Sequence, residues 1–395
     1  MISDKLILNN ALDLDKGSSD IHSALKGVID PELGADVVDL GMIHGVRVEG
    51  THADVDLALT IAECPQRGQL EEDTRRKARS VEGIETVTVH TTAMTGSQRS
   101  ALMETARLRA RERAAPTAVA PTTRVLAIAS GKGGVGKSTT TVNLAAALGA
   151  GGRRVGILDA DIWGFSIPRM LGTTDRITAN EDRQLLPVDA QGLEVVSTGL
   201  IADSEETALM WRGLMLSKAL EQFLTQTRWS ALDYLLIDMP PGTGDVQMAL
   251  SRLLPQAEMV VVTTPQRTAQ KVAVRVADMA RRSFMPIAGV VENMTSFVCD
   301  HGDEYTLFGS GGGDELAAEL GVPVLGRIPL DTSLVEGGDA GKPAATHAPD
   351  GAAGRAFHAL ADRVLDAVPP AEATCAVRID ELLGSIPARP DPAPR

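Results

Sequence analysis

Short apolar runs recur along the chain from residue 124 onward, and stretches with apolar residues at helical spacing separate several of them. Runs of this length rich in β-branched residues are typical of buried strands. Their alternation with helices predicts a doubly wound, mainly parallel α/β sheet over residues 124–368. The expected strands are 125–129, 154–158, 234–237, 259–263 and 287–291, and the clearest helices are 140–149, 268–282 and 351–368.

A different pattern comes first and predicts a small α/β domain over residues 1–96. It contains a helix at 21–29 and a turn at Pro31, followed by two strands, a polar helix and a third strand. The strands are expected at 42–48, 53–61 and 86–90, and the polar helix at 66–80.

Residues 97–123 are predicted to link the two domains. The first half is rich in Arg and is expected to form a short solvated helix, with a docking patch as the alternative. The second half is rich in Pro, Ala and Thr and reads as a tether. A further Pro/Ala-rich segment, 369–395, is expected to be a mobile tail.

The composition limits the classes of function. A chain of 395 residues suits two domains, and its formal charge of -14 argues against a dedicated nucleic-acid binder, which needs clustered Lys and Arg. No 18-residue stretch is apolar, and the first residues lack a signal-peptide pattern, so we expect a soluble, cytoplasmic protein with no membrane partner. Three widely spaced cysteines, Cys64, Cys299 and Cys375, exclude a disulfide framework.

A phosphate-binding motif lies between the first strand and the first helix of the larger domain. Residues 131–138 satisfy G-x-x-x-x-G-K-[ST], in which glycines let backbone N–H groups face phosphate oxygens at a helix N-terminus. Lys137 supplies a charge for the β- and γ-phosphates, and Ser138 supplies a hydroxyl for Mg²⁺. The predicted nucleotide-binding residues of the loop are Gly131, Lys132, Gly133, Gly134, Val135, Gly136, Lys137, Ser138 and Thr139.

Carboxylates follow two of the other predicted strands. Asp159 and Asp161 come after 154–158, and Asp238 comes after 234–237. The carboxyl ends of parallel strands face the crevice where open α/β sheets bind ligands. We therefore expect Asp238 to hold Mg²⁺ together with Ser138, and one of the first two aspartates to orient the attacking water.

The loop contains a second lysine, Lys132, beyond the one that the motif requires. With it, the loop resembles the deviant Walker A motif of a family that includes septum-site and plasmid-partition ATPases, nitrogenase iron protein and Mrp-type iron–sulfur carriers. The resemblance implies a homodimer in which Lys132 reaches the partner's nucleotide. It also implies that Asp161 activates water, that Asn293 hydrogen-bonds adenine, and that Lys132, Lys137, Asp161 and Asp238 carry hydrolysis of ATP.

The first domain resembles the small iron–sulfur assembly domain that is often fused to Mrp-type ATPases. The resemblance rests on segments 30–33, 38–41 and 59–65, the last of which ends at the mouth of a helix. Cys64 lies in that segment and has two interpretations. A thiol at a helix N-terminus suits contact with a metal or a cluster, whereas a lone Cys in a small domain otherwise serves packing.

The sequence departs from the Mrp-type pattern at a position that matters. Those carriers place two cysteines, separated by two residues, after the strand that ends near Asn293, as ligands of a bridging [4Fe–4S] cluster. Here Cys299 is present, but Gly302 stands at the second position. Either Cys299 still holds a cluster, with His301, Cys64 or an external thiol completing the ligands, or the site is vestigial.

The sequence as a whole predicts an ATPase that carries iron–sulfur clusters to apoproteins together with assembly factors, with ATP and Mg²⁺ as cofactors. The rival hypothesis is a ParA/MinD-like ATPase switch for spatial organisation. It should show ATP-dependent binding to DNA or lipid. The residues at 377–386 are too acidic for the basic amphipathic anchor of septum-site ATPases.

Overall fold

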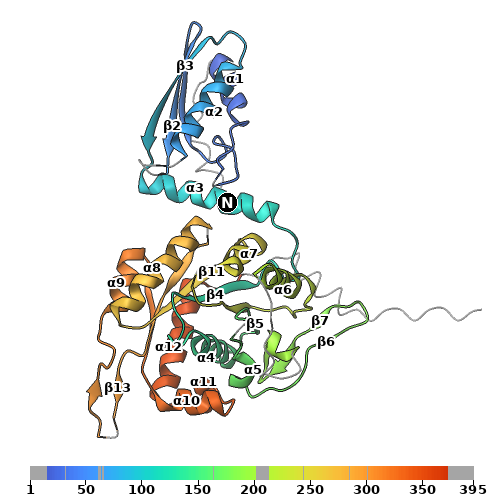
Figure 1. Cartoon of the computed structure of the whole chain (residues 1–395), viewed down its shortest axis with the longest axis vertical. Coiled ribbons are helices and arrows are strands. Elements are labelled where there is room, and N and C mark those ends of the chain that lie inside the picture. Colours follow the sequence, from blue (N-terminus) through green and yellow to red (C-terminus); the bar gives the residue numbers. More distant parts are fainter. Residues whose placement is uncertain are drawn as a thin grey trace, which may run out of the picture. The chain divides into compact units, whose positions relative to one another are not determined.

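The computed structural model describes residues 16–371, except 32, 61–63, 65, 163, 202–212, 243, 284 and 300. The chain forms two compact units that meet between Arg113 and Ala114. Each unit is considered by itself (Figure 1).

The first unit is a small α/β domain, as predicted. Its sheet has the strand order β1-β2-β3, with β1 antiparallel and β3 parallel to β2. Alternate residues of β2, namely Ala53, Val55 and Leu57, are fully buried, because α1 and α2 cover one face of the sheet. The elements are α1 (Lys16–Leu25), β1 (Ile43–Glu49), β2 (His52–Leu59), α2 (Arg67–Arg79), β3 (Thr86–Ala93) and α3 (Gly96–Arg113).

The predicted linker at 97–123 needs correction. Its first half is the 18-residue helix α3, which buries Leu102 and Ala106 and belongs to the first unit through an ion pair of 2.5 Å between Arg109 Nη2 and Asp39 Oδ2. Its second half belongs to the second unit, where Val119 lies in the hydrophobic core and the Thr123 hydroxyl donates to the Leu232 carbonyl. The first half is thus a helix, as predicted, but it packs on the first unit, and the buried Val119 is inconsistent with the free tether predicted for the second half.

The second unit is the predicted doubly wound sheet. Its strand order is β15-β12-β11-β4-β10-β5-β9-β8, and among the described strands of this sheet only the edge strand β8 runs antiparallel to its neighbour. The strands are β4 (Arg124–Ser130), β5 (Val155–Asp159), β8 (Val188–Ala190), β9 (Leu193–Ser197), β10 (Tyr234–Asp238), β11 (Glu258–Thr263), β12 (Ile287–Asn293) and β15 (Val324–Ile328).

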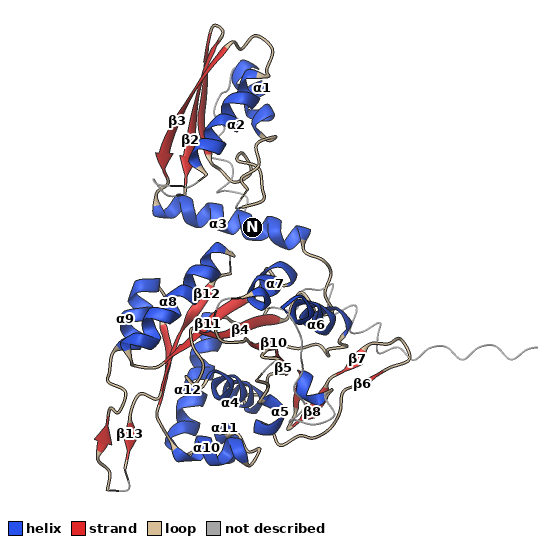
Figure 2. Ribbon diagram, in the orientation of Figure 1, coloured by secondary structure: helices blue, strands red, loops and turns tan. Residues whose placement is uncertain are grey.

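Helices cover both faces of this sheet (Figure 2). One aliphatic core lies between the sheet and α4 and α12, and the other lies between the sheet and α6, α7, α8 and α9. The helices are α4 (Lys137–Ala150), α5 (Ile167–Met170), α6 (Gly213–Gln226), α7 (Asp245–Leu253), α8 (Arg267–Arg282), α9 (Gly312–Leu320), α10 (Thr332–Asp339), α11 (Ala344–His347) and α12 (Ala352–Ala367).

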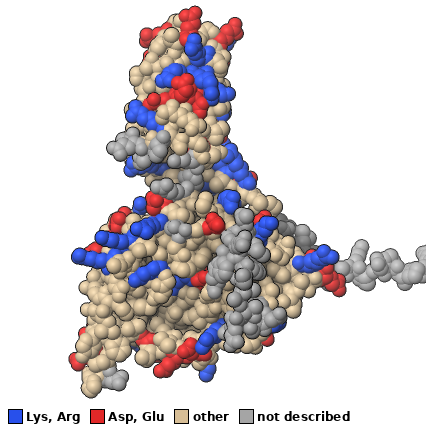
Figure 3. All heavy atoms as spheres, in the orientation of Figure 1, with Lys and Arg blue, Asp and Glu red and all other residues tan. Residues whose placement is uncertain are grey.

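Two small hairpins and a short helical turn extend from this unit. They are β6 (Thr178–Ala179) with β7 (Leu185–Leu186), β13 (Phe297–Val298) with β14 (Glu304–Tyr305), and the 3₁₀ turn η2 (Thr198–Leu200). Lys and Arg side chains gather where α8 lies, and charges of both signs are interspersed elsewhere on the face shown in Figure 3. Most of the expected tail, residues 372–395 with Cys375, lies outside the described residues.

The sheet brings the predicted functional groups to one edge. β10 lies between β4 and β5, and its last residue, Asp238, is in register with Asp159 of β5 and Ile128 of β4. The phosphate-binding loop begins at Gly131, directly after the last residue of β4. Parallel pairing therefore places the loop and both carboxylates side by side.

Candidate functional site

The phosphate-binding loop joins β4 to α4 and is held closely from behind. Gly136 has φ +81°, and a Cβ there would lie 2.1 Å from Nδ2 of Asn293. A Cβ at Gly131 would lie 2.5 Å from the carbonyl carbon of Val272 in α8. At Gly133 it would meet nothing within 4 Å, so the loop faces open space on that side. This is the form of an anion cradle at a helix N-terminus.

Lys137 begins α4 and lies among carboxylates from two strand ends. Its Nζ is 2.8 Å from Oδ2 of Asp238 and 3.7 Å from Oδ2 of Asp161. The Ser138 hydroxyl donates to the same Asp238 oxygen at 2.6 Å. The side chains of Lys137 and Asp238 are only 7% and 1% exposed, so this pair is held in a largely water-free setting.

Thr141 completes this group, and sequence reasoning missed it. Its hydroxyl donates to Oδ1 of Asp238 at 2.8 Å, so both oxygens of that carboxylate are bound. Thr141 lies one helical turn after Lys137 and therefore faces the same strand end. This helical spacing was the only signal in the sequence that could have revealed it.

Asp159 is fully buried behind these groups. Burial, followed by the charge of Asp238, raises its pKa to about 8. Its oxygens accept hydrogen bonds from the Ser197 hydroxyl at 3.0 Å and from the Asp161 backbone N–H at 3.2 Å. Burial also raises the pKa of Asp161, which the Lys137 charge opposes. Asp159 thus supports the loop of Asp161, and the more accessible Asp161 borders the cavity.

The second lysine of the loop has a partner within its own chain. Lys132 Nζ donates to Oε1 of Gln266, the residue that precedes α8, at 3.3 Å. The side chain therefore lies along the rim of the site, and Gln266 is another residue that sequence reasoning did not select.

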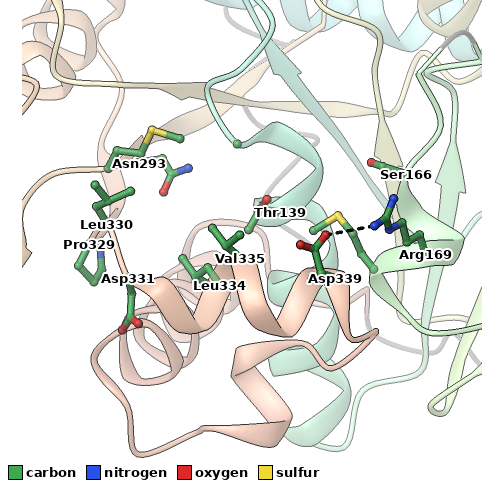
Figure 4. Close-up of a pocket in the computed structure, with 14 residues that line it drawn as sticks. Thr139, Ser166, Arg169, Asn293, Pro329, Leu330, Asp331, Leu334, Val335 and Asp339 are labelled. Carbon is green, nitrogen blue, oxygen red and sulfur yellow. Dashed lines mark hydrogen bonds and ion pairs between the residues drawn. The ribbon is translucent and has the colours of Figure 1, made fainter.

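Two cavities meet at the loop. One of about 230 Å³ holds most of the predicted phosphate and catalytic residues, and its lining includes Lys132, Gly133, Gly134, Gly136, Lys137, Ser138, Thr139 and Asp161. The other, of about 400 Å³, is lined mainly by apolar side chains and by Asn293 (Figure 4). Asn293 Nδ2 donates to the carbonyl of Val135 at 2.9 Å, which ties the end of β12 to the loop. Together the cavities offer a polar compartment for phosphates and an apolar one for a base.

Cys299 lies away from this site, in the turn between β13 and β14. Its backbone N–H donates to the Asp303 carbonyl at 3.0 Å, and its carbonyl accepts from Gly302 N–H at 2.9 Å. Gly302 has φ +87°, a conformation that a cysteine would adopt only with strain. The residue at 302 is thus suited to the turn. Among the described residues, no group of three or more His, Cys, Asp or Glu side chains could hold a metal ion.

Cys64 precedes α2, and its carbonyl accepts from Arg67 N–H at 3.1 Å. Its side chain is half-buried. The neighbouring residues 61–63 and 65 lie outside the described part of the chain, so the segment 59–65 is described only in part. The position at the start of a helix agrees with the sequence prediction.

Comparison with known proteins identifies the larger unit. A family model described as NUBPL iron-transfer P-loop NTPase matches residues 121–365. The chain belongs to this family. A second model, for iron–sulfur cluster assembly proteins, matches residues 18–91 of this P-loop NTPase. The predicted fold class and both family resemblances are therefore confirmed.

Relatives cover most of the NTPase. A protein of Mycobacterium tuberculosis (strain ATCC 25618 / H37Rv), named iron–sulfur cluster carrier protein, is 45% identical over 87% of this chain and 91% of its own length. A protein of the same name from Deinococcus radiodurans is 43% identical over 86% of this chain and 92% of its own.

Two solved structures are similar to parts of this chain. A nucleotide-binding protein of Archaeoglobus fulgidus, in complex with ADP, is 35% identical with a TM-score of 0.48, over 55% of this chain and 86% of its own. A domain of unknown function from Bacillus anthracis, DUF59, is 26% identical with a TM-score of 0.20, over 22% of this chain and 90% of its own. Within the described part of the NTPase, no helix is both long and apolar enough to span a bilayer.

Proposed function

We propose that this P-loop NTPase binds and hydrolyses Mg-ATP and delivers iron–sulfur clusters to apoproteins. The observation that carries the proposal is the buried group of Lys137, Ser138 and Asp238 at the strand ends, in a chain of the iron-transfer family. The names of the relatives that cover most of the chain support the cluster as cargo. The same names give no support to the rival hypothesis of a spatial organiser.

The residues present fit a magnesium nucleotide. Ser138 and Asp238 would hold Mg²⁺, which supplies charge to stabilise the transferring phosphoryl group. Lys137 would bind the β- and γ-phosphates, and its present contact with Asp238 keeps the ammonium compensated in a buried site. Asp161 borders the phosphate cavity and has a raised pKa, properties that suit a group that orients water and accepts its proton.

The proposal includes a homodimer. One chain supplies a single half-buried thiol at the β13–β14 turn, far short of the thiolates that an iron–sulfur cluster requires. Two copies of Cys299, supplemented by His301, Cys64 or an external thiol, would hold the cargo weakly enough to release it. In such a dimer Lys132 would leave Gln266 and serve the nucleotide of the other copy.

The test is delivery to an acceptor. The protein is reconstituted anaerobically with iron and sulfide, repurified, and mixed with an apo-[4Fe–4S] enzyme whose activity reports transfer. We expect faster activation than with free iron and sulfide at equal concentration, and faster activation with Mg-ATP than with a non-hydrolysable analogue. Activation no faster than with free iron and sulfide would contradict the carrier function, and ATP-dependent sedimentation with DNA or vesicles would favour the rival hypothesis.

A further inference from the structure

The apolar cavity of 400 Å³ has two charged side chains at one end that the roles above leave unused. Arg169 from α5 and Asp339 from α10 both line it, and they point toward each other at the end opposite Asn293 (Figure 4). The distance from Arg169 Nη2 to Asp339 Oδ1 is 3.5 Å. The side chains are 60% and 70% exposed, and a pair this exposed contributes little to stability. Their hydrogen-bonding capacity is therefore available to a ligand.

The other charged residue of the lining, Asp331, is already engaged. Its carboxylate caps α10 by accepting from Ser333 N–H at 2.9 Å, and its second oxygen accepts from Ala353 N–H at 3.3 Å. Asn293 likewise donates one amide N–H to the Val135 carbonyl. Within the described lining, Arg169 and Asp339 are thus the charged groups best able to recognise polar parts of a nucleoside.

The pair flanks the place where the two cavities join. Met170, the neighbour of Arg169, lines both cavities, as do Thr139 and Ser166. A Cβ on Gly338, the neighbour of Asp339, would lie 3.7 Å from Cε of Met170. In a nucleotide, the sugar joins the phosphates to the base. A ligand with phosphates in the smaller cavity and its base in the larger one would carry its ribose past this junction.

The backbone behind the pair is fixed. A Cβ on Gly341, just beyond α10, would lie 2.2 Å from Cα of Gly172, just beyond α5, so the two chain segments touch. Gln191 spans both, since its Nε2 donates to the carbonyls of Leu171 and Gly341 at 2.8 Å each. Gln191 has φ +58°, which a residue with a side chain adopts at a cost. This contact holds two helices that lie far apart in the sequence at a set separation.

We propose that Asp339 and Arg169 form a ribose-recognition site that selects ribonucleotides. The Asp339 carboxylate accepts hydrogen bonds from the sugar hydroxyls, and Arg169 orients that carboxylate. The inference rests on the proposed nucleotide function. It adds a discrimination between ribose and deoxyribose that Lys137 and Ser138 cannot make, because their proposed partners are the phosphates and Mg²⁺.

The experiment is calorimetric titration, with Mg²⁺ present, of the full chain with ATP, 2′-deoxy-ATP and inorganic tripolyphosphate. We compare wild type with Asp339→Asn and Arg169→Gln. The matched control is Asp314→Asn, which changes an aspartate of similar exposure that pairs with Arg327 and lines neither cavity.

Wild type and the control should bind ATP about tenfold more tightly than 2′-deoxy-ATP, as expected for a hydrogen bond to a charged acceptor. The ratio should fall below about twofold in Asp339→Asn and decrease in Arg169→Gln, with tripolyphosphate affinity unchanged in both. A ratio near one in wild type, or an undiminished ratio in Asp339→Asn, would overturn the proposal. If wild type bound neither ATP nor tripolyphosphate, the nucleotide function itself would fail, which is a distinct result.

Discussion

The nucleotide site and the β13–β14 hairpin both extend from carboxyl ends of strands in one sheet, yet they differ in how firmly their chemical groups are held. Asp238 is 1% exposed and accepts bonds from three side chains. Cys299 is half-buried, and hydrogen bonds of its backbone N–H and carbonyl hold it in the turn. Val298, Tyr305 and Leu307 around it are about half exposed, at 53%, 47% and 60%.

The difference has a physical cause. A buried charge is stable only when oppositely charged and hydrogen-bonding groups surround it. Replacing one residue of the Lys137, Ser138 and Asp238 group therefore leaves another without its partner and lowers stability. An exposed hairpin imposes no such penalty, and its ligands can vary without loss of the fold. The nucleotide site therefore keeps the whole G-x-x-x-x-G-K-[ST] motif at residues 131–138, whereas the hairpin has Gly302 at the position where the resemblance to Mrp-type carriers implies a second cysteine.

Lys137→Ala should have the largest effect. Among the described residues, Lys137 is the one cationic side chain that both contacts Asp238 and lines the phosphate cavity. Its loss should therefore lower the rate of ATP hydrolysis by about a hundredfold to a thousandfold. The steady-state rate of phosphate release measures this. Lys218→Ala, at an exposed lysine of α6, is the control and should retain the wild-type rate. Wild-type turnover in Lys137→Ala would refute the site assignment.

Lys132→Ala tests whether hydrolysis is completed across a dimer. The variant should still bind ATP, because Lys137 and the loop remain, but it should hydrolyse ATP about tenfold to a hundredfold more slowly through loss of one charged donor. Gln266→Ala removes only the partner within the chain, so it should retain most activity. Full ATPase activity of Lys132→Ala in a strictly monomeric preparation would contradict hydrolysis across a dimer.

These groups also show what sequence could supply. The motif at 131–138 and the strands ending at Asp159 and Asp238 predicted the site, because a parallel sheet brings such ends together. The roles of Thr141 and Ser197 were not predicted, because each depends on a hydrogen bond to a carboxylate from a segment distant in the sequence. The linker prediction failed for another reason: composition does not reveal that Leu102 and Val119 are buried.

Cys299→Ala and Cys64→Ala compare the hairpin with the first unit as holders of iron. If Cys299 ligates the cluster without help from Cys64, anaerobically reconstituted Cys299→Ala should lose iron and the visible absorption of a cluster, while Cys64→Ala keeps both. Wild-type iron should itself be labile, because the thiolate set is incomplete. Iron kept in Cys299→Ala and lost in Cys64→Ala would move the chemistry to the first unit. Iron absent from all three would leave the hairpin vestigial.

The smallest effect on ATP hydrolysis is expected at Asp159, a fully buried member of the nucleotide site whose protonation instead affects stability. Burial raises its pKa from 3.8 to about 8, so the folded protein keeps this proton at pH values where the unfolded chain has lost it. A raised pKa stabilises most at low pH, and this contribution to the free energy of unfolding is lost as pH rises from about 4 to about 8. Asp159→Asn has no proton to keep, so this part of the pH dependence should vanish, and the variant should gain stability relative to wild type as pH increases.

The change of stability with pH is measured from urea unfolding midpoints at pH values about one unit apart, between about 5 and about 8. Ser197→Ala is the informative companion, because the Ser197 hydroxyl donates to Asp159 and lowers its pKa. Without that hydrogen bond the pKa should be higher still, so the decline in stability should continue to a higher pH than in wild type. If stability changed with pH equally in wild type and Asp159→Asn, Asp159 would be ionised in the folded protein. The deeper burial of the nucleotide site would then not keep this carboxyl protonated.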